Sequence, residues 1–182
     1  MMRGQAEHPW RRSGVFRRFS RDTNGASTLE FAIVSVPLFL LILALFQVAF
    51  VFIATFALES ATSRAARLIR TGQAQSFSAA AFKDEVCKQL TAPLTCGSLQ
   101  LDVRKYTNFG SAAGGLTQPL NESGGMKDDF SFDPGKSGDV MVIRAFYPLD
   151  IGSMLPAEVS MSNMSGNARV LVATAAFRNE PF

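Results

Sequence analysis

The sequence predicts an α+β protein: a long N-terminal transmembrane helix, then a small head with one helix and an antiparallel sheet of about three strands. Two observations carry this prediction. Residues 31–58 form an apolar run of 28 residues without Asp, Glu, Lys or Arg, whereas a bilayer core needs only about 20 helical residues. The 124 residues after it are enough for one small domain, and they contain one helical pattern followed by three strand-like segments.

Residues 1–25 form a polar and basic stub. They carry six arginines against two acidic residues, a net charge of +4, while the rest of the chain sums to −1. The positive-inside rule predicts that this stub stays in the cytoplasm and that the C-terminal domain crosses the membrane. Because orientation explains the charge, we expect no nucleic-acid partner. We expect three parts: a leader over 1–25, a transmembrane and extended helix over 26–72, and a head domain over 73–182.

The long helix is expected over about residues 26–71. Asn24 or Ser27 is suited to cap it, and Ser27 and Glu30 have the spacing of a capping box. Pro37 lies inside the apolar run and predicts a kink, because proline removes one helical hydrogen bond.

The helix is expected to continue beyond the lipid. No breaker interrupts residues 57–70, and Gly72 is suited to end the helix. Three arginines follow one another at a spacing of three residues, which predicts either a solvated face near lipid headgroups or a contact with acidic groups of neighbouring subunits. They are Arg64, Arg67 and Arg70.

The head begins with a second helical segment. Residues 79–90 fit a helix that Ser78 caps and Pro93 stops. Residues 107–138, rich in Gly, Ser and Asp, and residues 148–168 predict irregular stretches, the first of them mobile or a contact surface. The period-2 alternation and the β-branched content of three segments predict strands. They are residues 99–106, 139–147 and 169–177.

Both cysteines, Cys87 and Cys96, follow the apolar run. In an oxidising compartment such a pair predicts a disulfide, and two unpaired thiols are the alternative. The only histidine, His8, is expected on the other side of the membrane. The exported part therefore lacks the residues for a Ser/His/Asp or Cys/His site, and we expect neither an enzyme nor a metal or other cofactor.

The junction between stub and apolar run predicts a proteolytic site. Gly25 and Ala26 offer a bond without side-chain bulk, and Glu30 lies five residues after it. A cut there creates an α-ammonium group about one helical turn from Glu30, where it can meet the Glu30 of a neighbouring helix in a low dielectric. The alternatives are that Gly25 is an ordinary linker glycine and that Glu30 compensates the helix dipole.

This arrangement resembles a type IV prepilin signal, and the chain is similar to the TadE-like family of pseudopilins of the Tad (tight adherence, Flp-type) pilus system. The matching segments are Gly25 to Phe31 (GASTLEF), residues 65–73 (AARLIRTGQ) and residues 177–182 (FRNEPF), together with the strands around Val103-Arg104 and Val142 to Arg144. Major Flp pilins are very short after their helix, so a shaft subunit is not expected for this longer chain.

The resemblance implies a membrane protein that a prepilin peptidase cleaves after Gly25. It implies a single pass with the N-terminus inside, an inner-membrane location with a periplasmic head, and packing against pilin and pseudopilin subunits and the Tad assembly platform. Incorporation into an extracellular pilus stays open. The alternative function is a single-pass inner-membrane envelope protein whose periplasmic domain binds a ligand or a scaffold.

Overall fold

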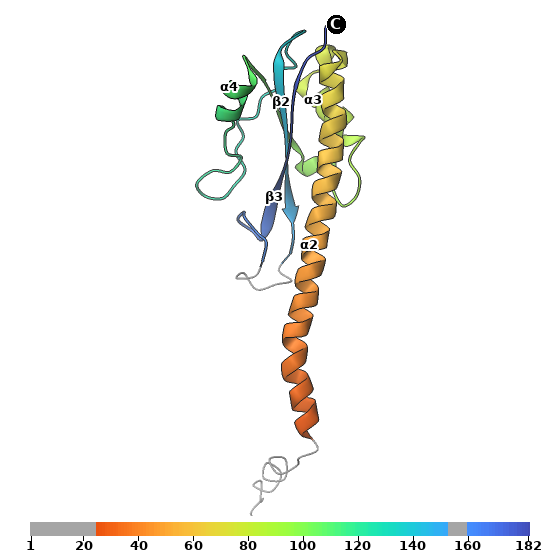
Figure 1. The fold of residues 1–182 in the computed structure, drawn as a ribbon, viewed down its shortest axis with the longest axis vertical. Helices are drawn as coiled ribbons and strands as arrows, with labels where there is room; N and C mark the ends of the chain where they lie inside the picture. The colour runs from red at the N-terminus through yellow and green to blue at the C-terminus, as the bar shows by residue number, and fades with distance from the viewer. Residues whose placement is uncertain (1–24, 153–159) are drawn as a thin grey trace, which may run out of the picture. The chain divides into compact units, whose positions relative to one another are not determined.

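The computed structural model describes residues 25–152 and 160–182. It divides into two compact units: an N-terminal unit, described over residues 25–41, and a second unit over residues 42–182. The expected α+β architecture, with one long apolar helix before three antiparallel strands, is confirmed (Figure 1). The predicted leader lies outside the described residues, apart from Gly25. The elements are α2 (Ala26–Arg70), a 3₁₀ helix (Gln73–Ser76), α3 (Ala79–Cys87), a 3₁₀ helix (Cys96–Ser98), β1 (Gln100–Tyr106), α4 (Phe109–Gly114), β2 (Val140–Asp150) and β3 (Ala168–Arg178).

Helix α2 has 45 residues and matches the expected span to within one residue at its end. Ser27 is its second residue, so the prediction of a cap at Ser27 is wrong; the other candidate, Asn24, lies outside the described residues. Pro37 lies within the helix. The hydroxyl of Ser35 donates to the Ala32 carbonyl at 3.0 Å, so it does not serve the carbonyl of Ile33, which Pro37 leaves without its helical donor.

The end of α2 is fixed by its backbone. Gly72 has a φ of 79°, in the left-handed region, and its N–H donates to the Ile69 carbonyl at 3.0 Å. The N–H of Thr71 donates to the Arg67 carbonyl at 3.0 Å. This confirms the prediction that a glycine with positive φ ends the helix.

The second helix begins as expected and ends early. The Ser78 hydroxyl accepts from the Ala81 N–H at 3.2 Å, which confirms the predicted cap. Helix α3 ends at Cys87 instead of Leu90, because the next turn tightens: the Leu90 N–H donates to the Cys87 carbonyl at 3.2 Å, three residues back.

The three strands form an antiparallel sheet in the order β1-β2-β3. Strand β2 extends to Asp150, and its pairing with β1 stops where Phe146 meets Gln100. Pro148 therefore lies in the central strand at a position that pairs only with β3. A proline is tolerated there because the missing N–H would point away from β3, toward the side where β1 has already ended.

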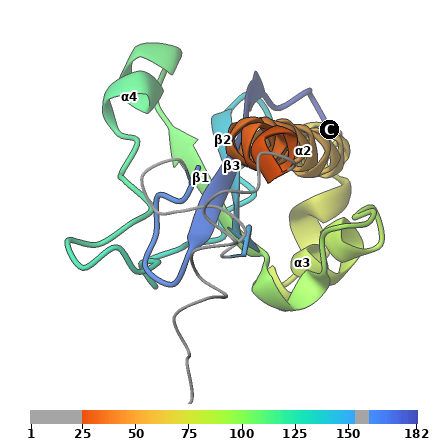
Figure 2. The same ribbon diagram turned by 90° about the horizontal axis from the view of Figure 1, so that it is seen from below.

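One face of the sheet carries the main core. Helices α2 and α3 lie on this side and α4 lies on the opposite side (Figures 1 and 2). Small residues of α2 allow the helix to approach the strands closely. The buried core includes Ala54, Leu58, Ala61, Ala65 and Ile69 of α2, Phe82 and Val86 of α3, and Met141, Ile143 and Ala145 of β2.

The opposite face is covered by part of the segment 107–138, which was predicted to be irregular. This segment contains α4, which Asn108 and Ser111 cap reciprocally, and its Phe130 ring stacks on Phe146 with centroids 5.2 Å apart. The sequence signal for α4 is the spacing of Asn108 and Ser111. The segment thus adds a partial third layer to the head.

Candidate functional site

The apolar part of α2 meets the criteria for a membrane span. It is the one described helix that is long and apolar enough, and only 11% of its most apolar 18-residue window is buried. A core helix of a soluble protein would be buried, whereas side chains such as Phe31, Leu41 and Phe46 are more than half exposed. The helix is therefore a single-pass candidate, and lipid or other helices are the environments that suit its surface.

Gly25 occupies the residue directly before α2. A Cβ built at Gly25 would meet no heavy atom within 4 Å, and its φ is not among the positive values. Neither packing nor backbone conformation in the described chain requires a glycine there.

Glu30 is the fifth residue of α2 and is exposed. It lies one residue beyond the first turn, so it is poorly placed for the alternative role of compensating the helix dipole there. Glu30 has no ion-pair or hydrogen-bond partner within residues 25–152 and 160–182. Ala26 stands four residues earlier, about one turn away on the same side of the helix.

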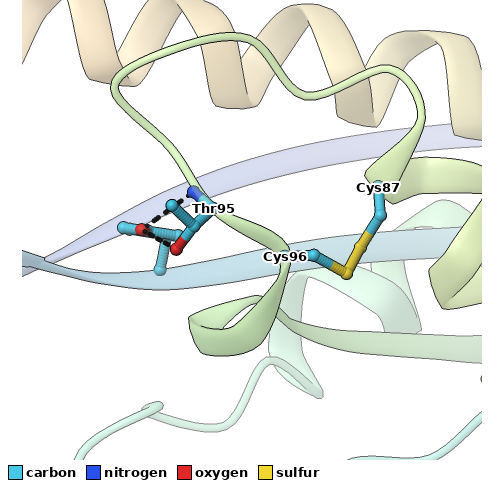
Figure 3. The surroundings of a disulfide bond; sticks show 4 residues. Cys87, Thr95 and Cys96 are labelled. Atoms are coloured by element: carbon cyan, nitrogen blue, oxygen red, sulfur yellow. Dashed lines mark hydrogen bonds between the residues drawn. A yellow bond between two sulfur atoms is a disulfide. The ribbon is translucent and has the colours of Figure 1, made fainter.

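Cys87 and Cys96 form a disulfide with their Cα atoms 5.3 Å apart (Figure 3). The bond joins the end of α3 to the 3₁₀ helix before β1. Next to it, the Thr95 N–H donates to the Tyr147 hydroxyl at 3.1 Å, and the two hydroxyls lie 3.2 Å apart. The connection between α3 and β1 is thus held to the central strand as well as to α3.

The structure brings together two segments that the sequence analysis singled out separately, the end of α2 and residues 177–182. The Glu180 N–H donates to the Arg70 carbonyl at 2.9 Å, and the Arg70 guanidinium lies 3.3 Å from the Glu180 carboxylate. The Phe182 ring covers Gly72 so closely that a Cβ there would lie 2.6 Å from the ring. We call these contacts the C-terminal latch. The opposite charges of Arg70 and Glu180 were the only sequence signal for it.

Asn179 anchors the latch to the neighbouring loop. It is buried, and its side-chain amide donates to the carbonyls of Pro134 and Lys136, both at 3.1 Å. Its backbone N–H donates to the Asp139 carbonyl at 2.9 Å. Buried amides that satisfy backbone carbonyls in this way fix one conformation of the loop.

A polar cluster lies on the second face of the sheet, around Asp102 of β1, and the sequence analysis did not predict it. Asp102 is buried and accepts from Arg104 Nε at 2.8 and 3.0 Å and from the Ser131 N–H at 3.0 Å. The hydrogen bond to Asp102 raises the pKa of Arg104. Burial lowers the pKa of Arg144, which lies over the Phe146 ring at 4.7 Å, against the opposing effect of the Asp102 charge.

These features describe a helix-anchored α+β protein with a disulfide in its head. Residues 25–67 match the family of TadE-like proteins, so the chain carries a TadE-like segment that runs from Gly25 to Arg67. No curated protein and no solved structure matched the chain. The match confirms the resemblance over the prepilin-like junction, the apolar run and two of the three arginines. The resemblance of residues 177–182 stays a prediction.

Proposed function

We propose that this protein is a minor pilin-like (pseudopilin) component of Tad-type pilus assembly, processed between Gly25 and Ala26 by a prepilin peptidase. One observation carries the proposal. A glycine without any packing or conformational role in the described chain stands directly before an exposed apolar helix, at the first residue of the TadE-like match. Recognition by a protease is a reason for that glycine which the fold itself does not supply.

Processing gives Glu30 its function in this proposal. Cleavage leaves a positively charged amine on Ala26, one turn from the exposed carboxylate of Glu30. A charge in an apolar environment costs several kcal/mol unless it is paired, and the attraction between opposite charges is strong where the dielectric is low. The amine of one subunit and the Glu30 of a neighbour therefore neutralise each other and set the register between packed helices.

The head and the membrane orientation complete the proposal. The basic stub stays in the cytoplasm, and the head extends from the inner membrane into the periplasm. The periplasm is an oxidising compartment, which permits the disulfide between Cys87 and Cys96. The partners are the prepilin peptidase, other pilin and pseudopilin subunits and the Tad assembly platform. The protein acts by subunit packing, without catalysis or a cofactor.

Intact-mass spectrometry of the protein from cells with and without the peptidase tests the cleavage. We expect the mature chain to begin at Ala26 only when the peptidase is present, and Gly25→Leu to retain the leader. Gly114→Leu is the matched control, because a Cβ at Gly114 also meets nothing within 4 Å, and it is expected to be processed normally. A full-length chain in cells with active peptidase would contradict the proposal and favour the plain single-pass envelope protein.

The same strains test the role of Glu30. We expect Glu30→Ala to leave membrane insertion and processing intact and to reduce pilus assembly, since the amine of the neighbouring subunit loses its partner. Glu122→Ala, at an exposed glutamate in the head, serves as the control. Normal piliation by Glu30→Ala would remove the charge-pairing argument.

A further inference from the structure

Strand β3 is an edge strand whose first residues are covered by a neighbouring turn. The Val170 N–H donates to the Asn163 side chain at 2.8 Å. The amides of Asn163 and Met164 both donate to the Ala168 carbonyl at 3.1 Å. In an antiparallel pair, the N–H and C=O of one residue point to the same side, and successive residues alternate. The even-numbered residues of β3 therefore direct their backbone groups away from β2.

Of the remaining even-numbered residues, Arg178 ends the strand and its guanidinium donates to the Gly138 carbonyl at 2.8 Å, and the three others before it are left open. Val172, Thr174 and Ala176 present three N–H and three C=O groups at this edge, and none of them has a hydrogen-bond partner in the part of the chain that the structure describes. All three residues are exposed, and none is a charged residue or a proline, the types that commonly block strand edges. The edge is a template for another strand.

A groove runs along this edge. It consists of two adjoining hollows of about 340 Å³ and about 280 Å³, which share Ser63 and Ala175. Five consecutive residues of β3 line it, and since successive side chains point to opposite faces, the groove follows the edge of the strand. Its other wall is one stripe of α2. The lining side chains are Glu59, Thr62, Ser63, Ala66, Arg67 and Arg70 of that stripe, together with Arg64 and residues 173–177.

The two ends of the groove carry side chains of opposite charge. Exposed Glu59 lines the hollow at Ala173, and the arginines line the hollow at Phe177. Two arginines are already engaged, since Arg64 donates to the Gln89 side chain at 3.0 Å and Arg70 pairs with Glu180. Arg67 is exposed and has no polar partner among residues 25–152 and 160–182. It is the cation available to a ligand in this groove.

A second copy of the chain does not suit this edge. Both walls of the groove run in the same direction, because Glu59 lies near Ala173 and Arg70 near Phe177. An antiparallel pair of β3 strands would thus set two α2 helices in opposite directions, which two chains inserted with the same orientation do not allow. A parallel pair would place the arginines of one copy beside those of the other, and like charges repel.

We propose that the groove between α2 and the edge of β3 binds an extended acidic segment of a different protein, which adds to the sheet as an antiparallel strand. Main-chain hydrogen bonds to Val172, Thr174 and Ala176 supply binding, and a carboxylate of the segment pairs with Arg67. The small side chains Ser63, Ala66 and Ala175 leave room for the side chains of the segment. At about 3.3 Å per residue, the five lining residues of β3 accommodate about five residues of partner.

The test uses the purified full chain in detergent micelles and the fluorescent peptide Glu-Glu-Val-Thr-Val-Thr-Lys. Antiparallel docking brings its glutamates to the arginine end and its lysine to Glu59. One control peptide has the charges exchanged, and another carries N-methyl groups on alternate residues, which removes hydrogen-bond donors. We expect saturable binding of the first peptide, which weakens as salt is added, and binding at least about tenfold weaker for either control.

Variants of the protein complete the test. Arg67→Glu reverses the available charge, and Lys105→Glu, at an exposed lysine on β1, is its matched control. Thr174→Pro removes an outward N–H and no internal bond, and Thr174→Ser keeps that N–H. We expect a loss of at least about tenfold in affinity for Arg67→Glu and Thr174→Pro only, with unchanged melting temperatures.

Three results would each overturn the proposal. They are equal affinities for all three peptides, an unchanged affinity of both the Arg67→Glu and the Thr174→Pro variant for the acidic peptide, and no binding of the acidic peptide up to about 1 mM. Because the measurement uses purified protein, its outcome does not depend on processing or pilus assembly. A failure here and a failure of the proposed function are therefore distinguishable.

Discussion

The contact between Gly72 and Phe182 gives a quantitative test of the C-terminal latch. Gly72 has a φ of 79°, and a Cβ there would lie 2.6 to 2.8 Å from three atoms of the Phe182 ring. Gly72→Ala therefore combines two costs: an L-residue in the left-handed region and the displacement of the ring. Phe182→Ala removes the ring and leaves only the first cost.

The two costs can be estimated separately. The left-handed conformation costs a residue with a Cβ roughly 1–2 kcal/mol. Phe182 is 54% exposed, so about half of the 1.5–3 kcal/mol of a fully buried phenylalanine, or about 1 kcal/mol, is lost when the ring leaves. We expect Gly72→Ala to lower the free energy of unfolding by about 2–3 kcal/mol in the natural chain and by about 1–2 kcal/mol in the Phe182→Ala background.

A double-mutant cycle measures the difference. The four proteins, each the full chain in detergent, are unfolded with urea and followed by the near-ultraviolet circular dichroism of Tyr106 and Tyr147, which lie in the sheet. This signal reports on the head. The expected coupling between the two positions is about 1 kcal/mol. An equal cost of Gly72→Ala in both backgrounds would show that the ring does not lie against Gly72.

Two further predictions concern the head. Cys87→Ser should lower the free energy of unfolding of the oxidised protein by about 2–3 kcal/mol, because the disulfide closes a loop with a sequence separation of 9; urea unfolding with and without reductant checks this, and an equal loss under reducing conditions would contradict it. Asp102→Ala should cost about 1–3 kcal/mol, because Arg104 and the Ser131 N–H lose their acceptor. Lys105→Ala, at an exposed neighbour, should change the unfolding midpoint little, and equal effects of the two substitutions would refute the role of Asp102.

The elements that the sequence predicted correctly are those with strong local signals. The apolar run and the glycine with positive φ gave the span of α2, and Ser78 gave the start of α3. Each strand was found to within three residues at its ends, since β-branched runs bounded by turn residues mark strands in the local sequence. The spacing of Cys87 and Cys96 suited a disulfide, and the structure contains one.

The sequence analysis fell short where residues distant in the chain determine the burial of a side chain or the end of an element. The alternation of β1 gave no sign that Asp102 is buried, and it is buried because a segment about 30 residues later in the chain folds over it. The end of α3 was placed too late, since the turn after Cys87 tightens toward the disulfide and the next strand. Helix α4 has its signal in Asn108 and Ser111, which the composition of the surrounding loop obscured.

The sequence by itself determined the long apolar helix, the place of Gly25 directly before it and the number of strands, because hydrophobic runs, helix breakers and side-chain periodicity act locally. Only the tertiary structure decided that Arg70 and Gly72 meet Glu180 and Phe182, and that the edge of β3 lies open beside Arg67. Those arrangements join residues that are about a hundred positions apart, and they follow from how the strands pair and pack on α2. No local pattern encodes such a contact, because its energy exists only after the chain has folded.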